Sequence, residues 1–280
     1  MPELPEIETI RRTIGPLIIG RRIRLVDVTQ PKAVATPCTE SFISMLTENR
    51  FIGLERRGKF LISELEDGCR LVMHMRMTGC LLVAHPDVPP EPHTHITISM
   101  DDGMELRFSD SRRFGRFWLY GPGEDIGACG ISRLGPEPFS MSFNADYLKS
   151  RIGRSGRTIK ECIMDQSVVA GIGNIYSDEI LFDVGIDPSR PAYSLTRDEF
   201  EILTRDIPEK LEYFTEMNAV TPDEYLETKG RDYRNTPYLR VYGHAGEPCP
   251  ICRTALVKRT IGGRGSVYCP KCQSRHRADT

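Results

Sequence analysis

Cys249-Pro250-Ile251-Cys252 and Cys269-Pro270-Lys271-Cys272 are two Cys-x2-Cys pairs, sixteen residues apart, near the end of this 280-residue chain. Two such pairs can supply four thiolates to a tetrahedral zinc ion, with no coordination position left open for catalysis. A pair of redox dithiols is the alternative, but it needs a βαβ context that the sequence lacks. The stretch therefore predicts a two-stranded ribbon around one structural Zn²⁺, whose binding supplies much of the module's folding free energy.

Charge is distributed unevenly around this predicted module. Residues 231–280 carry ten Lys and Arg residues against three acidic ones, whereas the other 230 residues carry 27 basic and 36 acidic ones. The formal net charge of −2 for the whole chain argues weakly against a nucleic-acid partner. The asymmetry instead favours a basic C-terminal module that binds a polyanion, with a solvated basic tail as the alternative.

The remaining cysteines do not indicate a disulfide framework. Five of the nine are scattered among apolar or loop residues: Cys38, Cys69, Cys80, Cys129 and Cys162. No apolar run approaches the ~20 residues of a membrane span, and the N-terminus lacks the apolar core of a signal peptide. We therefore expect a reduced protein inside the cell, with no membrane segment.

Residues 20–135 are predicted to be mostly β-structure, after a first helix that ends at Gly15-Pro16. Short apolar runs are separated by turn signals: Ile23–Val28, Phe51–Leu54, Phe60–Leu65, Arg70–His74, Gly79–Val83, His95–Met100, Met104–Phe108 and Gly115–Tyr120. This spacing favours an antiparallel sandwich or a flattened barrel. A helix is expected around Glu40–Thr47, and Leu134–Pro138 is interpreted as a linker.

From Phe143 onward the pattern becomes helical. The expected helices are Ala145–Arg151, Thr158–Met164, Asn174–Val184 and Thr196–Met217, with Asn174 as a cap and with Pro208 kinking or splitting the last helix. Residues 218–240 are polar and predicted to be irregular. We therefore expect an α+β, multidomain chain: domain 1–135, helical domain 143–240 with a mobile loop at 217–237, and zinc finger 241–280.

The N-terminus, Met1-Pro2-Glu3-Leu4-Pro5-Glu6, carries the most specific chemistry. If Met1 is removed, Pro2 presents a secondary amine with an ordinary pKa of about 7.7–8.0, so part of it is neutral and nucleophilic. Such an amine forms a charged iminium with a sugar aldehyde carbon, which is suited to covalent catalysis and elimination. Glu3 lies beside it and can move protons. The alternative is an ordinary helix start with proline in the first turn.

Two loop regions add weaker signals. Gly171-Ile172-Gly173 separates two helices, and free N–H groups at such a helix start can hold a phosphate. In the β region, Met77, Arg112 and Phe114 lie on predicted loops. Met and Phe there are usually core residues, but beside Arg they can instead form a wedge that enters stacked DNA and replaces an extruded base.

Taken in order, these motifs resemble the formamidopyrimidine-DNA glycosylase family, from Pro2 to Cys272. The matching segments are Pro2–Glu6, the Lys59 loop, the Met77 loop, Arg112–Gly115, Leu134–Pro138, Gly171–Tyr176, Val241–Gly243 and the four cysteines. The resemblance implies an N-terminal antiparallel β-sandwich with an N-terminal helix, then a helix–two-turns–helix domain that ends in a zinc-ribbon finger. Damaged double-stranded DNA would lie across the cleft between them.

The resemblance also implies a base-excision-repair DNA glycosylase with AP lyase activity on oxidised purines, namely 8-oxoguanine and formamidopyrimidines. Pro2 would attack C1′ of the flipped nucleotide, Glu3 would move protons, and β,δ-elimination would cut the strand. The other implied roles follow position by position: a catalytic and phosphate contact for Lys59, further DNA contacts for His93, Asn174, Tyr242 and Arg264, a void-filling trio of Met77, Arg112 and Phe114, and pocket-side positions for Glu6 and Glu179.

The chain departs from the family in its loop. Asn218-Ala219-Val220-Thr221-Pro222 stands where oxidised-purine enzymes often have Gly-Gly-Ser/Thr-Thr, and Arg231-Asp232-Tyr233 replaces Lys-Pro-Gly, which puts the 8-oxoguanine preference in doubt. Three alternatives stay open: an endonuclease VIII-type enzyme for oxidised pyrimidines, a non-catalytic binder of damaged DNA, and a zinc-ribbon transcription factor. We expect a monomer that acts in the cytoplasm or nucleoid.

Overall fold

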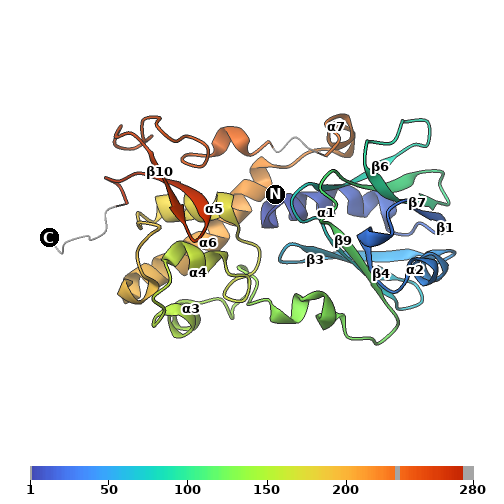
Figure 1. Cartoon of the computed structure of the whole chain (residues 1–280), viewed down its shortest axis with the longest axis horizontal. Helices are drawn as coiled ribbons and strands as arrows, with labels where there is room; N and C mark the ends of the chain where they lie inside the picture. Colours follow the sequence, from blue (N-terminus) through green and yellow to red (C-terminus); the bar gives the residue numbers. More distant parts are fainter. Residues whose placement is uncertain (1, 231–233, 274–280) are drawn as a thin grey trace. The chain divides into compact units, whose positions relative to one another are not determined.

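The computed structural model describes residues 2–230 and 234–273. The chain divides into two compact units, Met1–Ser132 with Asn218–Arg234 and Arg133–Met217 with Asn235–Thr280 (Figure 1). This division groups residues 218–234, which we predicted within the helical domain, with the first unit. Residues 231–233 of the expected mobile loop and residues 274–280 of the expected finger lie outside the described residues. The domain boundaries themselves stay a prediction.

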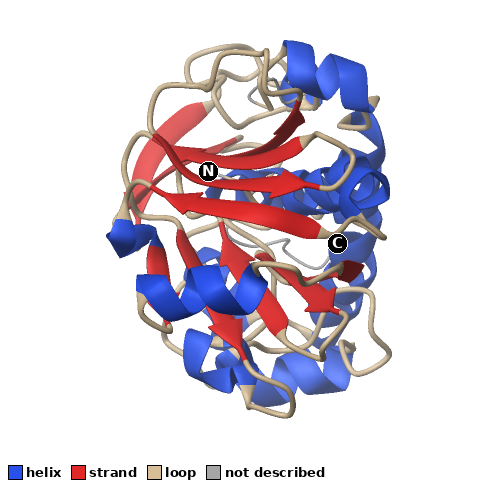
Figure 2. Cartoon of the chain, turned by 90° about the vertical axis from the view of Figure 1, so that its right-hand side faces the viewer, coloured by secondary structure: helices blue, strands red, loops and turns tan. Residues whose placement is uncertain are grey.

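Two β-sheets form the first unit (Figure 2). One sheet has the order β1-β7-β8-β6 and the other the order β2-β9-β5-β4-β3. Their strands are β1 (Ile23–Val28), β2 (Val34–Thr36), β3 (Phe51–Arg57), β4 (Phe60–Leu65), β5 (Arg70–His74), β6 (Gly79–Ala84), β7 (Thr94–Met100), β8 (Glu105–Asp110) and β9 (Arg116–Tyr120). All neighbours pair antiparallel except β2 and β9, which are parallel. The predicted sandwich and its eight predicted strands are confirmed, whereas β2 was missed.

Alternating apolar residues build the core of this unit. Ile96, Ile98, Leu106 and Phe108 are at most 2% exposed and belong to one buried cluster together with Phe117 of the other sheet. Because successive residues of a strand point to opposite faces, this alternation gives each sheet one buried face. Burial of this apolar surface is the main favourable term in folding.

Helix α1 (Leu4–Ile18) packs against β3 and β4 of the same unit. It buries Ile7, Ile10, Ile14 and Ile18, which lie three or four residues apart on one face. The predicted end at Gly15-Pro16 is wrong because Pro16 is exposed in the last turn, where water can satisfy the carbonyl that loses its donor. Helix α2 (Thr39–Leu46) matches the predicted second helix within one residue at each end.

Residues 222–227 are helical, so the prediction that the segment 218–240 is irregular is wrong for this part. Thr221 and Glu224 form a capping box for helix α7 (Pro222–Glu227), and Pro222 lies in the first turn, where no backbone donor is needed. Tyr225 is 6% exposed and joins the core of the unit. Asn218 Nδ2 donates to Thr9 Oγ1 at 3.0 Å, and Lys229 forms an ion pair with Glu91 at 2.7 Å.

The second unit is helical and carries the ribbon. Its elements are α3 (Ala145–Ile152), α4 (Ile159–Met164), α5 (Asn174–Asp183), α6 (Arg197–Met217), β10 (Val257–Ile261) and β11 (Arg264–Tyr268). Helix α6 packs against α3 and α5, while α5 also packs against α4 and β11. Helix α6 continues through Pro208, so of the kink or split predicted there, the split is wrong and the kink stays a prediction. Gly173 is the N-cap of α5, which corrects the prediction of Asn174.

Short elements complete the chain. The 3₁₀ segments are Pro31–Ala33, Ile126–Cys129, Ile131–Arg133, Ala192–Ser194 and Thr236–Tyr238. The predicted linker 134–138 is attached to the second unit, because Gly135 N donates to Gln166 O at 2.8 Å and Ala170 N donates to Pro136 O at 3.0 Å. Among the described residues, no helix has both the length and the apolar content that crossing a membrane requires.

Candidate active site and nucleic-acid interface

The start of α1 places the predicted nucleophile and its neighbouring acid. Glu3 is the N-cap residue, is 1% exposed, and forms a reciprocal capping box with Glu6. In this box Glu3 N donates to Glu6 Oε2 at 2.7 Å, while the Glu3 carboxylate accepts the backbone N–H of Glu6. The N-terminal end of a helix favours negative charge. The box therefore holds the Glu3 carboxylate in place directly after Pro2, which is also buried.

Lys59 lies in the turn between β3 and β4, at the same end of the unit as Pro2. Two contacts show how α1 runs along β3: Leu54 lies beside Gly15, and Arg56 Nε lies 3.2 Å from Glu8 Oε2. Moving along β3 toward its turn therefore leads toward the N-terminus of α1. Lys59 is 8% exposed. The structure thus brings Lys59 to the end of α1 that carries Pro2 and Glu3.

His74, at the end of β5, lies near Lys59, and no sequence motif pointed to it. Its ring packs edge-on against Phe60 with centroids 4.5 Å apart, and its Nδ1 accepts the backbone N–H of Arg76 at 2.9 Å. Burial, with the nearby charges of Arg76 and Lys59, lowers the pKa of His74 to about 3. His74 is therefore neutral at physiological pH and adds no positive charge beside Lys59.

The three predicted wedge residues do gather. Arg112 Nη1 lies 3.2 Å from Met77 Sδ, and its guanidinium carbon lies 4.9 Å from the centre of the Phe114 ring. Met77 is 38% exposed and Phe114 is 47% exposed, so both apolar side chains that contact Arg112 lie at the surface and not in the core. The arrangement favours the wedge interpretation over the core interpretation for this trio.

Asp110 organises both loops that carry this trio, and sequence reasoning missed it. The carboxylate is 1% exposed and accepts hydrogen bonds from Thr78 Oγ1, from Arg112 N at 3.1 Å and from Gly115 N at 2.7 Å. Its backbone N–H also donates to His93 O at 3.0 Å. The buried carboxylate therefore connects the loop of Met77 to the loop of Phe114, and the backbone of the same residue connects both to the exposed His93.

In the second unit, Glu179 holds the segment that contains Tyr242. The buried carboxylate accepts N–H groups from Arg240 at 2.9 Å, Val241 at 3.0 Å and Tyr242 at 2.8 Å. Burial raises the pKa of the Glu179 carboxyl, and these three bonds oppose that shift because they favour the ionised form. The described contacts give Glu179 an anchoring role; its predicted pocket-side role stays a prediction.

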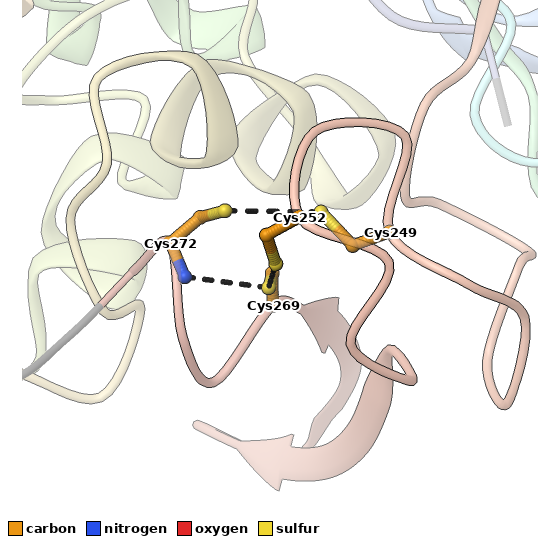
Figure 3. Close-up of side chains that lie close together, drawn as sticks. All are labelled: Cys249, Cys252, Cys269 and Cys272. Atoms are coloured by element: carbon orange, nitrogen blue, oxygen red, sulfur yellow. Dashed lines mark hydrogen bonds between the residues drawn. The ribbon is translucent and has the colours of Figure 1, made fainter.

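The ribbon cysteines form a compact cluster (Figure 3). The four Sγ atoms lie within 4.8 Å of one another, with Cys249–Cys272 at 3.8 Å and Cys252–Cys269 at 3.4 Å. A tetrahedron with Zn–S bonds of about 2.3 Å has S–S edges of roughly 3.8 Å. The four thiols therefore fit one structural Zn²⁺, as predicted.

Comparison with known proteins follows the same order along the chain. Family models match the formamidopyrimidine-DNA glycosylase N-terminal domain at residues 1–117, the formamidopyrimidine-DNA glycosylase H2TH domain at 134–223, and a zinc finger found in FPG and IleRS at 246–275. A formamidopyrimidine-DNA glycosylase from Symbiobacterium thermophilum is 42% identical over 98% of this chain and 89% of its own length. This chain belongs to the formamidopyrimidine-DNA glycosylase family.

Solved structures of the formamidopyrimidine-DNA glycosylase family agree with this result. The Lactococcus lactis enzyme in complex with DNA that contains FAPY-dG is 33% identical and has a TM-score of 0.89, covering 97% of this chain and 100% of its own. The same enzyme with DNA that contains an oxidised pyrimidine is also 33% identical, with a TM-score of 0.89 over 98% of this chain and 100% of its own. A transcription factor that shares only the ribbon is therefore excluded.

The predicted site residues fall into two groups. The first unit holds Pro2, Glu3, Glu6, Lys59, Met77, His93, Arg112 and Phe114, and the second holds Asn174, Glu179, Tyr242, Arg264 and the four cysteines. Within each group the contacts are those given above. The roles of these residues toward DNA stay predictions.

Proposed function

We propose that this chain is a base-excision-repair DNA glycosylase with AP lyase activity, acting on oxidised purines in double-stranded DNA. Membership of the family along the whole chain supports the reaction class. The observation that carries the proposal is the start of α1, where a proline that can become the N-terminal residue precedes an acid held by a capping box. We infer that the protein works at the nucleoid, because its substrate is damaged duplex DNA.

The proposed chemistry uses the N-terminal amine of Pro2 once Met1 is removed. The nitrogen lone pair forms a bond to C1′ of the flipped nucleotide, and the bond from C1′ to the damaged base breaks as the base leaves with a proton. Opening of the sugar ring gives an iminium at C1′. Loss of a C2′ proton then expels the 3′ phosphate, and a second elimination expels the 5′ phosphate. The iminium is the electron sink for both eliminations.

The remaining residues of the first unit would support this chemistry. Glu3 is proposed to move protons at the opening sugar because the capping box fixes its carboxylate on the residue that directly follows the reacting proline. Lys59, carried by the turn at the same end of α1, is proposed to contact the phosphate and the reacting nucleotide. Met77, Arg112 and Phe114 are proposed to fill the space of the extruded nucleotide, with Arg112 facing the orphaned base.

Borohydride trapping tests the proposal, since reduction of the iminium leaves a covalent protein–DNA adduct. We expect adducts on duplexes that carry 8-oxoguanine opposite cytosine or an abasic site, and at least about a 100-fold lower trapping rate for Pro2→Gly with little change in folding. Intact mass of the free protein must show that Met1 is absent. If that protein forms no adduct on either duplex, the enzyme proposal fails and a non-catalytic binder of damaged DNA is favoured.

One observation favours oxidised pyrimidines as a second substrate class. The L. lactis relative was solved with DNA that contains an oxidised pyrimidine. In this chain the segment 218–230 lacks the family's paired glycines and instead forms α7, which leaves it less conformational freedom to adapt to one base. A thymine glycol duplex in the same trapping series tests this: an excision rate within about tenfold of 8-oxoguanine would establish broad use. No adduct on thymine glycol would restrict the enzyme to purines.

A further inference from the structure

A buried ion pair connects α4 and α5 to the ribbon. Lys160 Nζ lies 2.6 Å from Asp178 Oδ1, and both side chains have zero exposure. The same carboxylate accepts Ser266 Oγ at 2.6 Å and Val267 N at 2.9 Å, both from β11. One carboxylate thus links two helices to one strand. Helices α4 and α5 and the ribbon that begins with β10 all belong to the second unit (Figure 1).

The contacts continue along β11 toward its exposed end. Asn174 lies one turn before Asp178 on α5, and its Nδ2 donates to Gly265 O at 3.0 Å. Lys160 Nζ also approaches that oxygen at 3.5 Å. Three successive residues of β11, 265 to 267, are therefore held by α4 and α5. Arg264, which comes directly before them, is exposed.

This arrangement sets the face on which Arg264 lies. Side chains of a strand alternate between its two faces, so a slip of one residue would move Arg264 to the opposite face. The turn before Arg264 is also tightly packed: a Cβ on Gly262, whose φ is +54°, would lie 2.4 Å from Glu161 Cγ. The register of the strand is thus specified from both sides of Arg264.

Stability alone does not account for the ion pair. Replacing a buried pair by apolar residues of similar size is often neutral or stabilising, because desolvation of two charges offsets their attraction. The ribbon also has other support, namely the cysteine cluster and the buried contacts of Phe182, Val241 and Leu256. A role in setting a geometry fits the observations better than a role in holding the module together.

We propose that Asp178 and Lys160 are positioning residues for DNA binding, which set the register of Arg264 relative to Asn174 so that both can contact backbone phosphates. This inference rests on the proposed function, through the phosphate contacts predicted for Asn174 and Arg264. Such contacts supply affinity and salt dependence and do not read sequence. Neither member of the ion pair touches DNA in this proposal.

The test is a double-mutant cycle on the full, zinc-loaded chain. Fluorescence anisotropy measures binding to a duplex that carries a tetrahydrofuran abasic analogue and to an undamaged duplex over a series of salt concentrations. Arg264→Ala should weaken binding about tenfold and lower the salt slope by about one. In an Asp178→Asn background the same change should cost less than about twofold, because Arg264 is already displaced.

Controls separate positioning from folding. Glu199→Gln removes the ion-pair partner of Arg190 in the same unit without removing a side-chain contact of Asp178, and its effect should add to that of Arg264→Ala. If Asp178→Asn does not fold, the cycle is run in Lys160→Met/Asp178→Asn, which buries no unpaired charge. When the enzyme is saturating, the single-turnover rate of 8-oxoguanine excision by the Asp178→Asn variant should change less than about twofold, because the variant loses DNA affinity and not chemistry.

Each outcome is informative. Additive losses for Asp178→Asn and Arg264→Ala, with zinc content and wild-type DNA binding intact, would overturn the positioning role and leave the proposed function standing. Failure of the wild-type protein to bind either duplex would overturn the proposed function, and this inference with it. Strong coupling for Asp178→Asn, with none for Glu199→Gln, supports the positioning role.

Discussion

The wedge loops are the two loops that carry Met77, and Arg112 with Phe114. Replacing Asp110 by asparagine should destabilise them more than replacing any exposed residue within them. The carboxylate accepts hydrogen bonds from Thr78, Arg112 and Gly115, and asparagine keeps only one acceptor oxygen. Its amide would therefore face at least one N–H or O–H donor. The loss of one buried charge-assisted bond costs about 1.5–3 kcal/mol, which corresponds to a Tm lower by roughly 3–12 °C in a unit of this size.

The functional consequence should depend on whether the DNA must be opened. On duplex DNA with 8-oxoguanine opposite cytosine, we expect kcat/KM to fall about tenfold, which is a loss of about 1.4 kcal/mol in transition-state stabilisation. On a single strand with an abasic site no base has to be extruded, so cleavage should change less than about twofold. Gel-based cleavage of both substrates under the same conditions measures the two effects.

A matched control for Asp110→Asn is Asp67→Asn. Asp67 also accepts a backbone N–H in a turn of the same unit, from Cys69 at 2.9 Å, but it lies between β4 and β5. This variant should leave the ratio of duplex to single-strand cleavage unchanged. Equal losses on both substrates for Asp110→Asn would refute the reasoning, because they would show a general loss of active protein instead of disordered wedge loops.

Three further results are expected. His74 has a pKa of about 3 in the folded chain against about 6.5 in the unfolded chain. Its contribution to the free energy of unfolding is therefore complete above pH 6.5 and declines below it, by about 2 kcal/mol at pH 5. Thermal unfolding of His74→Gln over this pH range should lack this part of the pH dependence. Cys269→Ala should lose zinc and DNA affinity together, measured by metal analysis and anisotropy; unchanged cleavage would contradict the finger's placement on DNA. Gly230→Ala puts a Cβ 2.6 Å from Cys80 Sγ at φ +61°, so limited proteolysis of segment 218–230 should accelerate several-fold, with partial rescue by Cys80→Ala.

Elements with strong local signals could be predicted from the sequence. The strands of the sandwich have apolar alternation bounded by turn residues, and α6 begins with a real capping box between Thr196 and Glu199. The errors in the predicted elements arise where tertiary packing overrides a local preference, or where an element is too short to show a pattern. Pro16 does not end α1, because Ile18 in its last turn is buried. Strand β2 has only three residues before Pro37, too few to show a period. Helix α7 begins with a capping box of Thr221 and Glu224, which could have been recognised in the sequence.

The residues that position the site could not be predicted in the same way. Lys160 and Asp178 are 18 positions apart, and charged residues in helices are mostly exposed, so the sequence gives no sign that both are fully buried. Asp110 ends an ordinary strand, and its partners come from two loops that meet only in the folded unit. Motifs identify groups that touch substrate, whereas the groups that orient them depend on tertiary contacts.

The start of α1 shows why a short motif can point to candidate catalytic residues although the residues that support them were missed. Pro2 precedes the N-cap Glu3, and the nitrogen at that position takes no part in the hydrogen bonds of the helix. Glu3 and Glu6 satisfy the first donors of the helix with their own side chains. The same short segment therefore specifies a helix start and a nucleophile beside an acid. A local motif can reveal chemistry of this kind, because the structural and the proposed catalytic demands fall on neighbouring residues.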